Sequence, residues 1–476
     1  MNILAIDQGT SSTKALVIGP QREVLAEAEV PVHPTATPDG GVEHDPEALW
    51  QSVLEASRAA LAQADEPVGA VGLSNQGETV LAWDRTTGRP LSSAIVWQDR
   101  RATGVCEALA GRADELESIS GLKLDPYFAA PKMTWLREQV TGEGVVTTSD
   151  VWLLWRLCGA FVTDAATASR TMLLDLDGVS WSPVACDAFG MDPAALPAIA
   201  PCAGIVGETE AFGAALPVAG IAVDQQAALF AEGCHRAGEA KCTFGTGAFL
   251  LATVGTQARR SKSGLVGCVA WTLDDETTYC LDGQVYTAGA AVTWLQEVGL
   301  IDRPSDLDGL GSTVDTTGGA AFVPGLAGLA APFWRPEARG AFVGLSLGTG
   351  RAHLVRAVCE GIAAEVAWLA RAAAADLGSP LERLRVDGGL TRSTTLMQLQ
   401  ADLLQAPVEL YPLPHATALG VAAFARLGVG DAASPAAAVG SWRPAAVFEP
   451  TISADEATER LEAWRAVAEG TMELHV

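Results

Sequence analysis

The 476-residue sequence lacks the features that mark membrane and secreted proteins. Its longest apolar runs are interrupted by Gly, Asp or Arg before they reach the roughly 18 residues that a membrane span requires. The first residues, Met1 to Asp7, contain neither a basic patch nor a small-residue cleavage site, which argues against a signal peptide. We therefore expect a cytoplasmic protein with no membrane partner.

Paired cysteines and a positive charge balance are also missing. The nine cysteines occur singly, without a C-x-x-C pair or a zinc-like Cys/His spacing, so we expect reduced core residues. The formal net charge of -26 repels nucleic-acid phosphates, and nucleic acid is not an expected partner. A single nucleotide is compatible with this charge, because its phosphates would meet backbone N–H groups and Mg²⁺ at one local site.

The sequence does contain apolar strands that alternate with helical stretches, a pattern that predicts α/β domains. The chain is too long for one hydrophobic core, so two large domains are expected. Segments 3–18 and 240–254 each consist of an apolar strand, a Gly-Thr turn and a second apolar strand. This similarity predicts two domains of the same topology, which we place at residues 1–235 and 236–476.

The first of these turns has the composition of a phosphate-binding segment. Gly9 allows a close backbone approach, Thr10 and Ser11 offer hydroxyl donors, and Asp7 can hold Mg²⁺ through water. The alternative is a hairpin turn whose geometry Asp7 simply stabilises. A turn has no need of the cation that Lys14 supplies, which favours the phosphate interpretation. The second turn, Gly245 to Gly247, would face the first across a cleft if the halves are duplicated.

Asp224 ends an apolar strand and begins an amphipathic helix. An aspartate at the N-cap would be a sufficient explanation. The functional alternative is a carboxylate at the carboxyl end of a strand, where open α/β sheets place ligands. Such a group can take the proton of an attacking hydroxyl during phosphoryl transfer. This segment alone does not decide between the two.

Three other polar segments also allow both a structural and a functional interpretation. The Gly388-Gly389 turn suits an adenine lying on bare backbone, but it also suits an ordinary left-handed turn. Trp97 precedes Gln98 in a polar segment and offers a platform for the apolar face of a polyol, although most tryptophans lie in cores. Gly77 interrupts a polar turn after the apolar run 68–73, either as a backbone bend or as room for a ligand.

Taken in order, these segments resemble the FGGY carbohydrate kinase family and, within it, the glycerol kinases. The resemblance extends over nearly the whole chain. Its most informative motifs are DQGTSS at 7–12, NQGET at 75–79, IVWQ at 95–98, DPYF at 125–128, ASRT at 168–171, DQQAALF at 224–230, GTG at 245–247 and VDGG at 386–389.

The resemblance implies two actin-like, ribonuclease-H-like domains with a central inter-domain cleft, and a homodimer or homotetramer. It implies that ATP, with Mg²⁺, phosphorylates a primary hydroxyl of a small polyol or sugar, with Asp224 as general base and Asp7 as organiser of Mg²⁺ and phosphate. The implied nucleotide and phosphate contacts are Gly9, Thr10, Ser11, Lys14, Thr246, Gly247, Gly289, Gly388, Gly389 and Ser393. The implied polyol contacts are Gly77, Glu78, Trp97, Tyr127, Asp224, Gln225 and Phe249.

Two segments depart from the glycerol kinase pattern. Those enzymes carry an arginine that donates to glycerol where this chain has Gly77, so we predict a four- or five-carbon polyol or ketose as substrate. A glycerol kinase that makes glycerol 3-phosphate is the alternative. Bacterial glycerol kinases often bind fructose 1,6-bisphosphate through an arginine loop, whereas segment 207–217 is acidic and has no arginine. We therefore predict no inhibition by that sugar bisphosphate.

Two other classes of function remain to be weighed. An actin-like ATPase would use water as the nucleophile and would need no polyol pocket, which the aromatic residues argue against. A silent sugar-binding regulator would not need both Asp7 and Asp224.

Overall fold

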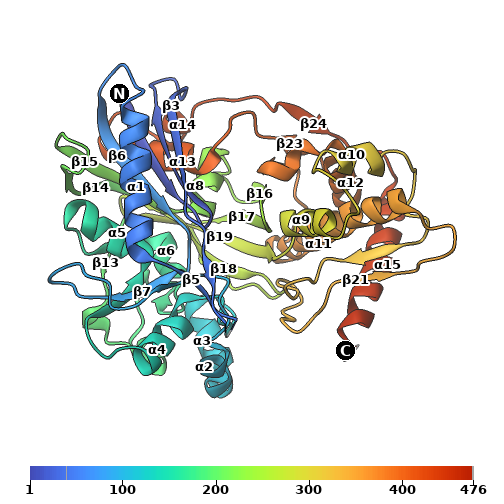
Figure 1. Ribbon diagram of the computed structural model, residues 1–476, viewed down its shortest axis with the longest axis horizontal. Helices are drawn as coiled ribbons and strands as arrows, with labels where there is room; N and C mark the ends of the chain where they lie inside the picture. Colours follow the sequence, from blue (N-terminus) through green and yellow to red (C-terminus); the bar gives the residue numbers. More distant parts are fainter. Residues whose placement is uncertain (39, 474–476) are drawn as a thin grey trace.

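The computed structural model describes residues 1–38 and 40–473 (Figure 1). Within this part of the chain, a 13-stranded sheet has the order β24-β23-β22-β16-β17-β19-β18-β14-β15-β6-β1-β2-β3. The first half of the chain lies at one end of this sheet and most of the second half at the other (Figure 1). No helix in residues 1–38 and 40–473 is long and apolar enough to cross a membrane.

The two halves share one strand arrangement. In the first half the order β3-β2-β1-β6-β15 joins β1 (Asn2–Gln8), β2 (Ser12–Ile18), β3 (Val24–Pro31), β6 (Val68–Asn75) and β15 (Leu216–Val223). In the second half the order β19-β17-β16-β22-β23 joins β16 (Ala240–Phe244), β17 (Ala248–Gly255), β19 (Glu276–Val285), β22 (Leu384–Asp387) and β23 (Val408–Leu410). In both, an antiparallel hairpin precedes two parallel strands. The predicted repeat of topology is therefore present in the sheet.

The helices cover the sheet and connect its strands (Figure 1). They are α1 (Pro46–Leu61), α2 (Thr103–Ala108), α3 (Ala113–Ser120), α4 (Ala129–Gln139), α5 (Ser149–Cys158), α6 (Ala165–Ser169), α7 (Pro183–Ala188), α8 (Asp224–Ala231), α9 (Gly289–Glu297), α10 (Asp306–Gly311), α11 (Arg351–Leu377), α12 (Thr394–Leu404), α13 (Ala416–Gly428), α14 (Pro435–Val439) and α15 (Ala454–Met472).

The remaining strands extend the large sheet or form small ones. They are β4 (Thr35–Ala36), β5 (Val42–His44), β7 (Val80–Trp83), β8 (Ala94–Ile95), β9 (Val145–Thr148), β10 (Val162–Asp164), β11 (Leu174–Asp175), β12 (Ser180–Trp181), β13 (Ala198–Ala200), β14 (Ala203–Thr209), β18 (Val266–Leu273), β20 (Ala321–Val323), β21 (Ala341–Val343) and β24 (Ala446–Phe448).

Helix α13 links the two halves, because it comes late in the chain yet packs on strands β1, β6 and β15 and on helix α8. Glycines permit this close packing. A Cβ at Gly420 would lie 1.9 Å from the carbonyl oxygen of Ala227, and a Cβ at Gly220 would lie 2.5 Å from the backbone nitrogen of Ala425. The contact holds α8, and with it Asp224, against the carboxyl ends of the strands.

The predicted strands and helices are largely present, with two differences. The apolar run at 93–97 predicts a strand, of which only the two residues of β8, Ala94–Ile95, are present. The Ala- and Pro-containing tract 431–447 predicts a surface connection, but it contains α14 and the start of β24. The Ser434 side chain caps α14, Pro435 occupies its first turn, and β24 pairs with β23.

Candidate active site

The strand register brings the predicted carboxylates to one edge of the sheet. Asp7 of β1 lies opposite Ser74 of β6, and Ser74 lies opposite Ala222 of β15. Asp224 follows β15 directly as the first residue of α8. Because the carboxyl ends of parallel strands meet at the same edge, both aspartates face the space beyond the sheet, where ligands of α/β proteins bind.

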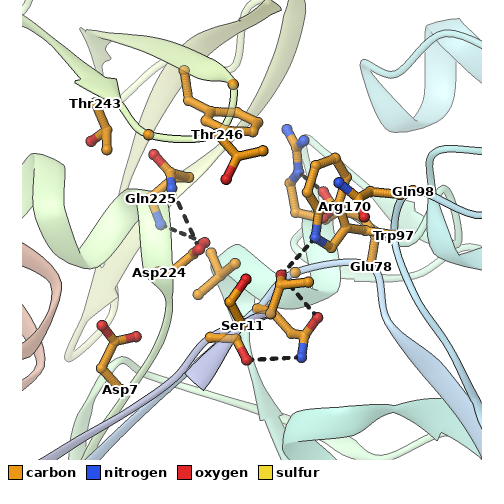
Figure 2. Close-up of a pocket in the computed structure, with 18 of the residues that line it drawn as sticks. Asp7, Ser11, Glu78, Trp97, Gln98, Arg170, Asp224, Gln225, Thr243 and Thr246 are labelled. Atoms are coloured by element: carbon orange, nitrogen blue, oxygen red, sulfur yellow. Dashed lines mark hydrogen bonds and ion pairs between the residues drawn. The ribbon is translucent and has the colours of Figure 1, made fainter. Parts of the chain in front are cut away.

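A cavity of about 530 Å³ occupies this edge. Figure 2 shows Asp224 and Gln225 on one side of it and Glu78, Trp97 and Arg170 on the other. The predicted residues that line it are Asp7, Gly9, Thr10, Ser11, Lys14, Gly77, Glu78, Trp97, Tyr127, Asp224, Gln225, Thr246, Gly247 and Phe249. Folding therefore gathers the predicted acidic, phosphate-binding and polyol-binding residues around one space.

Asp224 does not make the hydrogen bonds of an N-cap, because α8 begins at this residue and Val223 holds the cap position. One carboxylate oxygen, Oδ1, accepts from the backbone N–H of Gln225 at 2.7 Å, and Oδ2 accepts from the Gln225 side-chain amide at 3.4 Å. Burial raises the pKa of Asp224, while these hydrogen bonds and Lys241 act in the opposite direction. The carboxylate is thus held in place, as a proton acceptor requires.

Asp7 has a strongly perturbed environment. Burial, followed by the negative charge of Asp224, raises the pKa of Asp7 to about 7, against the lowering effect of Lys14. A divalent cation here would relieve the repulsion between the two carboxylates. The described residues contain no group of three or more acidic, His or Cys side chains that could form a metal cage. The pair of carboxylates suits Mg²⁺, which commonly binds through one or two carboxylates, water and phosphate oxygens.

Arg170 is a site residue that the sequence reasoning missed. It follows α6, is 4% exposed, lines the cavity, and donates hydrogen bonds to Glu78 and to Asp282 of β19. Its ion pairs therefore connect the two halves of the chain. Burial raises the pKa of Glu78, and the charge of Arg170 opposes that effect. The ASRT motif at 168–171 was the only sequence signal for this residue, and the motif by itself assigned no function to Arg170.

The backbone strain of the polar turn falls on Glu78, not on Gly77. Glu78 has a φ of +55°, which non-glycine residues seldom adopt and which often marks functional sites. Gly77 lies outside the left-handed region, and a Cβ there would meet only the Cγ2 of Val223, at 3.0 Å. Gly77 is therefore not needed for the bend, and a larger residue would fit after a small shift of Val223.

Three aromatic rings form a wall of the cavity. Trp97 packs edge-on against Tyr127 and Phe249, with ring centroids 5.8 and 6.1 Å apart. The indole N–H of Trp97 donates to the Thr10 hydroxyl at 2.9 Å, and that hydroxyl donates to Gln76. The predicted platform is thus present as an aromatic cluster. The Thr10 hydroxyl, whose contact with phosphate stays a prediction, fixes the orientation of Trp97.

A second cavity, of about 640 Å³, meets the first at Gly245 and Thr246. Gly289, Gly389 and Ser393 line it, as predicted for a nucleotide pocket. The Ser393 hydroxyl donates to Asp308, which also lines this cavity.

Two glycines here are explained by close backbone contacts. A Cβ at Gly289 would lie 2.5 Å from the carbonyl oxygen of Gly245, against which α9 begins. Gly388, predicted to contact nucleotide, lines neither cavity. It has a φ of +96°, and its Cβ would lie 2.4 Å from the carbonyl oxygen of Phe244. Gly388 therefore brings β22 and β16 together.

Residues 2–231 match the N-terminal domain, and residues 240–428 the C-terminal domain, of the FGGY family of carbohydrate kinases. The chain belongs to this family. It is 43% identical over 487 residues to the glycerol kinase of Thermus brockianus, and the alignment covers 98% of each chain. It is 42% identical over 489 residues to that of Bordetella parapertussis, covering 98% of this chain and 96% of the relative.

Solved structures of FGGY kinases share the fold. The glycerol kinase of Plasmodium falciparum, solved with ADP, superposes with a TM-score of 0.91 at 30% identity, covering 100% of this chain and 99% of the other. The xylulose kinase of Rhodospirillum rubrum has a TM-score of 0.87 at 24% identity, with 99% of each chain covered, and at that identity shows the fold alone. The predicted two-domain, actin-like fold is confirmed.

This FGGY kinase is accordingly a phosphotransferase that uses ATP with Mg²⁺ and has an alcohol group as acceptor. This activity argues against the two competing classes of function. Neither an actin-like ATPase with water as acceptor nor a silent regulator agrees with membership in this enzyme family. The acceptor is a small molecule.

Proposed function

We propose that this enzyme is a glycerol kinase, which transfers the γ-phosphoryl group of ATP to a primary hydroxyl of glycerol and forms glycerol 3-phosphate. The similarity to relatives named glycerol kinase over 98% of the chain carries this choice of acceptor. The cavity supports it, because Asp224, Glu78 and the aromatic wall surround one small space. The glycerol alternative thereby takes precedence over the four- or five-carbon substrate expected from Gly77.

In the proposed reaction, Asp224 accepts the proton of the attacking hydroxyl. An ionised aspartate is a weak base, which suffices because proton loss is late in a loose phosphoryl-transfer transition state. Glu78 accepts hydrogen bonds from substrate hydroxyls, and the rings of Trp97 and Phe249 contact the carbon chain and exclude water. When bound, Mg²⁺ neutralises phosphate charge, and Asp7 would hold it through water.

The phosphate groups would extend from the first cavity toward the second. Lys14 and Gly9 of the first turn segment and Thr246 and Gly247 of the second turn all line the first cavity. The adenosine part would occupy the second cavity, which Gly289 and Gly389 line. Catalysis would then rest on positioning and charge stabilisation, as is general for phosphoryl transfer.

A longer acceptor is the second candidate, and Gly77 is the observation that favours it. Loss of a charge-assisted donor costs about 1.5–3 kcal/mol, or roughly a 10- to 150-fold weaker hold on glycerol. A tetritol, pentitol or ketose would place further hydroxyls in the space at Gly77. Arg170 does not replace this donor, because its ASRT motif is shared with the glycerol kinases and its guanidinium is already engaged by Glu78 and Asp282.

A substrate panel tests the proposal. A coupled ADP-release assay would compare glycerol with erythritol, threitol, xylitol, ribitol and small ketoses at saturating Mg·ATP. We expect the highest kcat/KM with glycerol. A higher value with a longer acceptor would establish the second candidate, and ATP turnover unaffected by every acceptor would overturn both.

Three further properties stay proposals. The domain boundary at 235/236 is supported by the repeated strand order of the two halves, and limited proteolysis tests it. A homodimer or homotetramer is inferred from the habit of the family, and sedimentation velocity measures it. A cytoplasmic location is likewise a proposal for this ATP-dependent kinase, and cell fractionation tests it.

A further inference from the structure

A buried lysine lies behind the catalytic carboxylate and has no role in the steps above. Lys241, on β16, is 0% exposed. Its ammonium donates to Oε1 of Gln225 at 2.6 Å and to the hydroxyl of Thr243 at 2.7 Å. Keeping a charge in a protein interior requires such partners. Lys241 belongs to the second half of the sheet, whereas Gln225 belongs to α8, so this contact joins the two halves.

The chemistry of these groups determines how Gln225 is oriented. An ammonium group has only hydrogen-bond donors, so it must face the oxygen of the Gln225 amide. The amide NH₂ is then directed at Asp224, and Figure 2 shows Gln225 donating to that carboxylate. If Lys241 were absent, the amide could rotate and present its oxygen to Asp224, which would repel the carboxylate. Lys241 therefore decides which face of Gln225 meets the catalytic base.

We propose that Lys241 is a positioning residue for the catalytic base: acting through Gln225, it holds the Asp224 carboxylate in the orientation that accepts the substrate proton. This inference rests on the proposed kinase reaction, in which Asp224 is that base. Lys241 itself lies behind the cavity lining and contacts Gln225, which does line it. Its effect should therefore appear in the chemical step and not in the binding of either substrate.

The charges around this chain of contacts define the expected pH dependence. Asp224 is influenced by Lys241 and Arg170, which favour its ionised form, and it in turn interacts with Asp7 and Glu78. On its other side Lys241 is coupled to Asp387 of β22 and to Glu232 at the end of α8, since its charge opposes the raised pKa of each. Removing Lys241 would leave Asp224 with a higher pKa, so activity would fall at a higher pH on the acidic side.

Lys241→Met tests the proposal, because methionine keeps the length of the side chain but donates no hydrogen bond. The acceptor is whichever substrate the wild-type enzyme uses best, so failure of the glycerol assignment is recognised separately. We expect kcat to fall about 10²-fold, while KM for acceptor and for Mg·ATP changes less than about threefold. The acidic limb of kcat against pH should move to higher pH. Lys123→Met, the same change at a lysine paired with Glu117, should leave all these values unchanged.

An unchanged kcat, or a loss confined to KM, would overturn the proposal. Gln225→Leu provides a second test, because it removes the intermediate group and leaves Lys241 in place. The double variant should be no slower than the slower single variant, since both changes break one chain of contacts. Independent, multiplying losses would count against the proposal. If Lys241→Met does not fold, as circular dichroism would show, wild-type kcat in Gln225→Leu at saturating acceptor would itself overturn it.

Discussion

Gly77→Arg is the substitution that most directly examines how this enzyme selects its acceptor. The new Cβ would meet only Cγ2 of Val223, at 3.0 Å, so the backbone can accept the change after a small shift. The added guanidinium would give the cavity a charge-assisted donor worth about 1.5–3 kcal/mol. For glycerol this corresponds to a gain in kcat/KM of roughly 10- to 150-fold. We expect the lower half of this range, because Arg170 already neutralises Glu78.

Longer acceptors should respond in the opposite direction, because the side chain occupies the space that their additional carbons would need. The ADP-release assay would therefore measure the ratio of kcat/KM for glycerol to that for erythritol and xylitol. Gly77→Ala is the matched control, since it adds the Cβ without the donor. If Gly77→Arg and Gly77→Ala show the same ratio, the idea that position 77 governs acceptor choice through hydrogen bonding is wrong.

Three other predictions concern the base, a buried core carboxyl and regulation. Asp224→Asn should abolish phosphoryl transfer yet retain ADP binding in calorimetry, because the amide cannot accept the proton. Glu365 of α11 is 1% exposed, and neither carboxylate oxygen has a hydrogen-bond partner among residues 1–38 and 40–473. Burial raises the pKa of Glu365 well above 4.5, so its contribution to stability is present below pH 4.5 and is lost as the pH rises. The loss is about 1.4 kcal/mol per pH unit up to the folded pKa, and thermal unfolding should show Glu365→Gln becoming more stable relative to the wild type as the pH rises above 4.5. Fructose 1,6-bisphosphate should not inhibit in the ADP-release assay, because segment 207–217 supplies no arginine and Arg58, which reaches it, already donates to the carbonyl of Ala211.

Each of these predictions has a clear contrary result. Near-normal turnover by Asp224→Asn would remove this residue as the base. A stability difference between Glu365→Gln and wild type that does not vary above pH 4.5 would show that Glu365 is already ionised in the folded protein, so that its pKa is not raised. A dose-dependent loss of activity with the sugar bisphosphate would mean that another basic group binds it.

Much of the fold followed from local sequence. The hairpin at 3–18 could be predicted because buried apolar runs flank a Gly-Thr turn, and β1 and β2 pair as that pattern requires. The same signal found β16 and β17, and it therefore found the repeat. The helix α14 was missed, because one helical turn leaves little periodicity to detect, and the strand predicted at 93–97 proved longer than the two paired residues of β8.

The sequence by itself determined the chemistry available to this protein, through Asp7, Asp224 and the phosphate turns. The identity of these residues and their position at strand ends can both be read from the local sequence pattern. Only the tertiary structure decided what surrounds them. Arg170 acquires its role because folding places it between Glu78 and Asp282, which lie far away in the chain. Only the folded structure likewise explains why position 388 is a glycine, because a Cβ there would collide with the backbone of Phe244 on a neighbouring strand. Contacts between residues distant in sequence depend on strand order and register, and no short stretch of sequence contains that information.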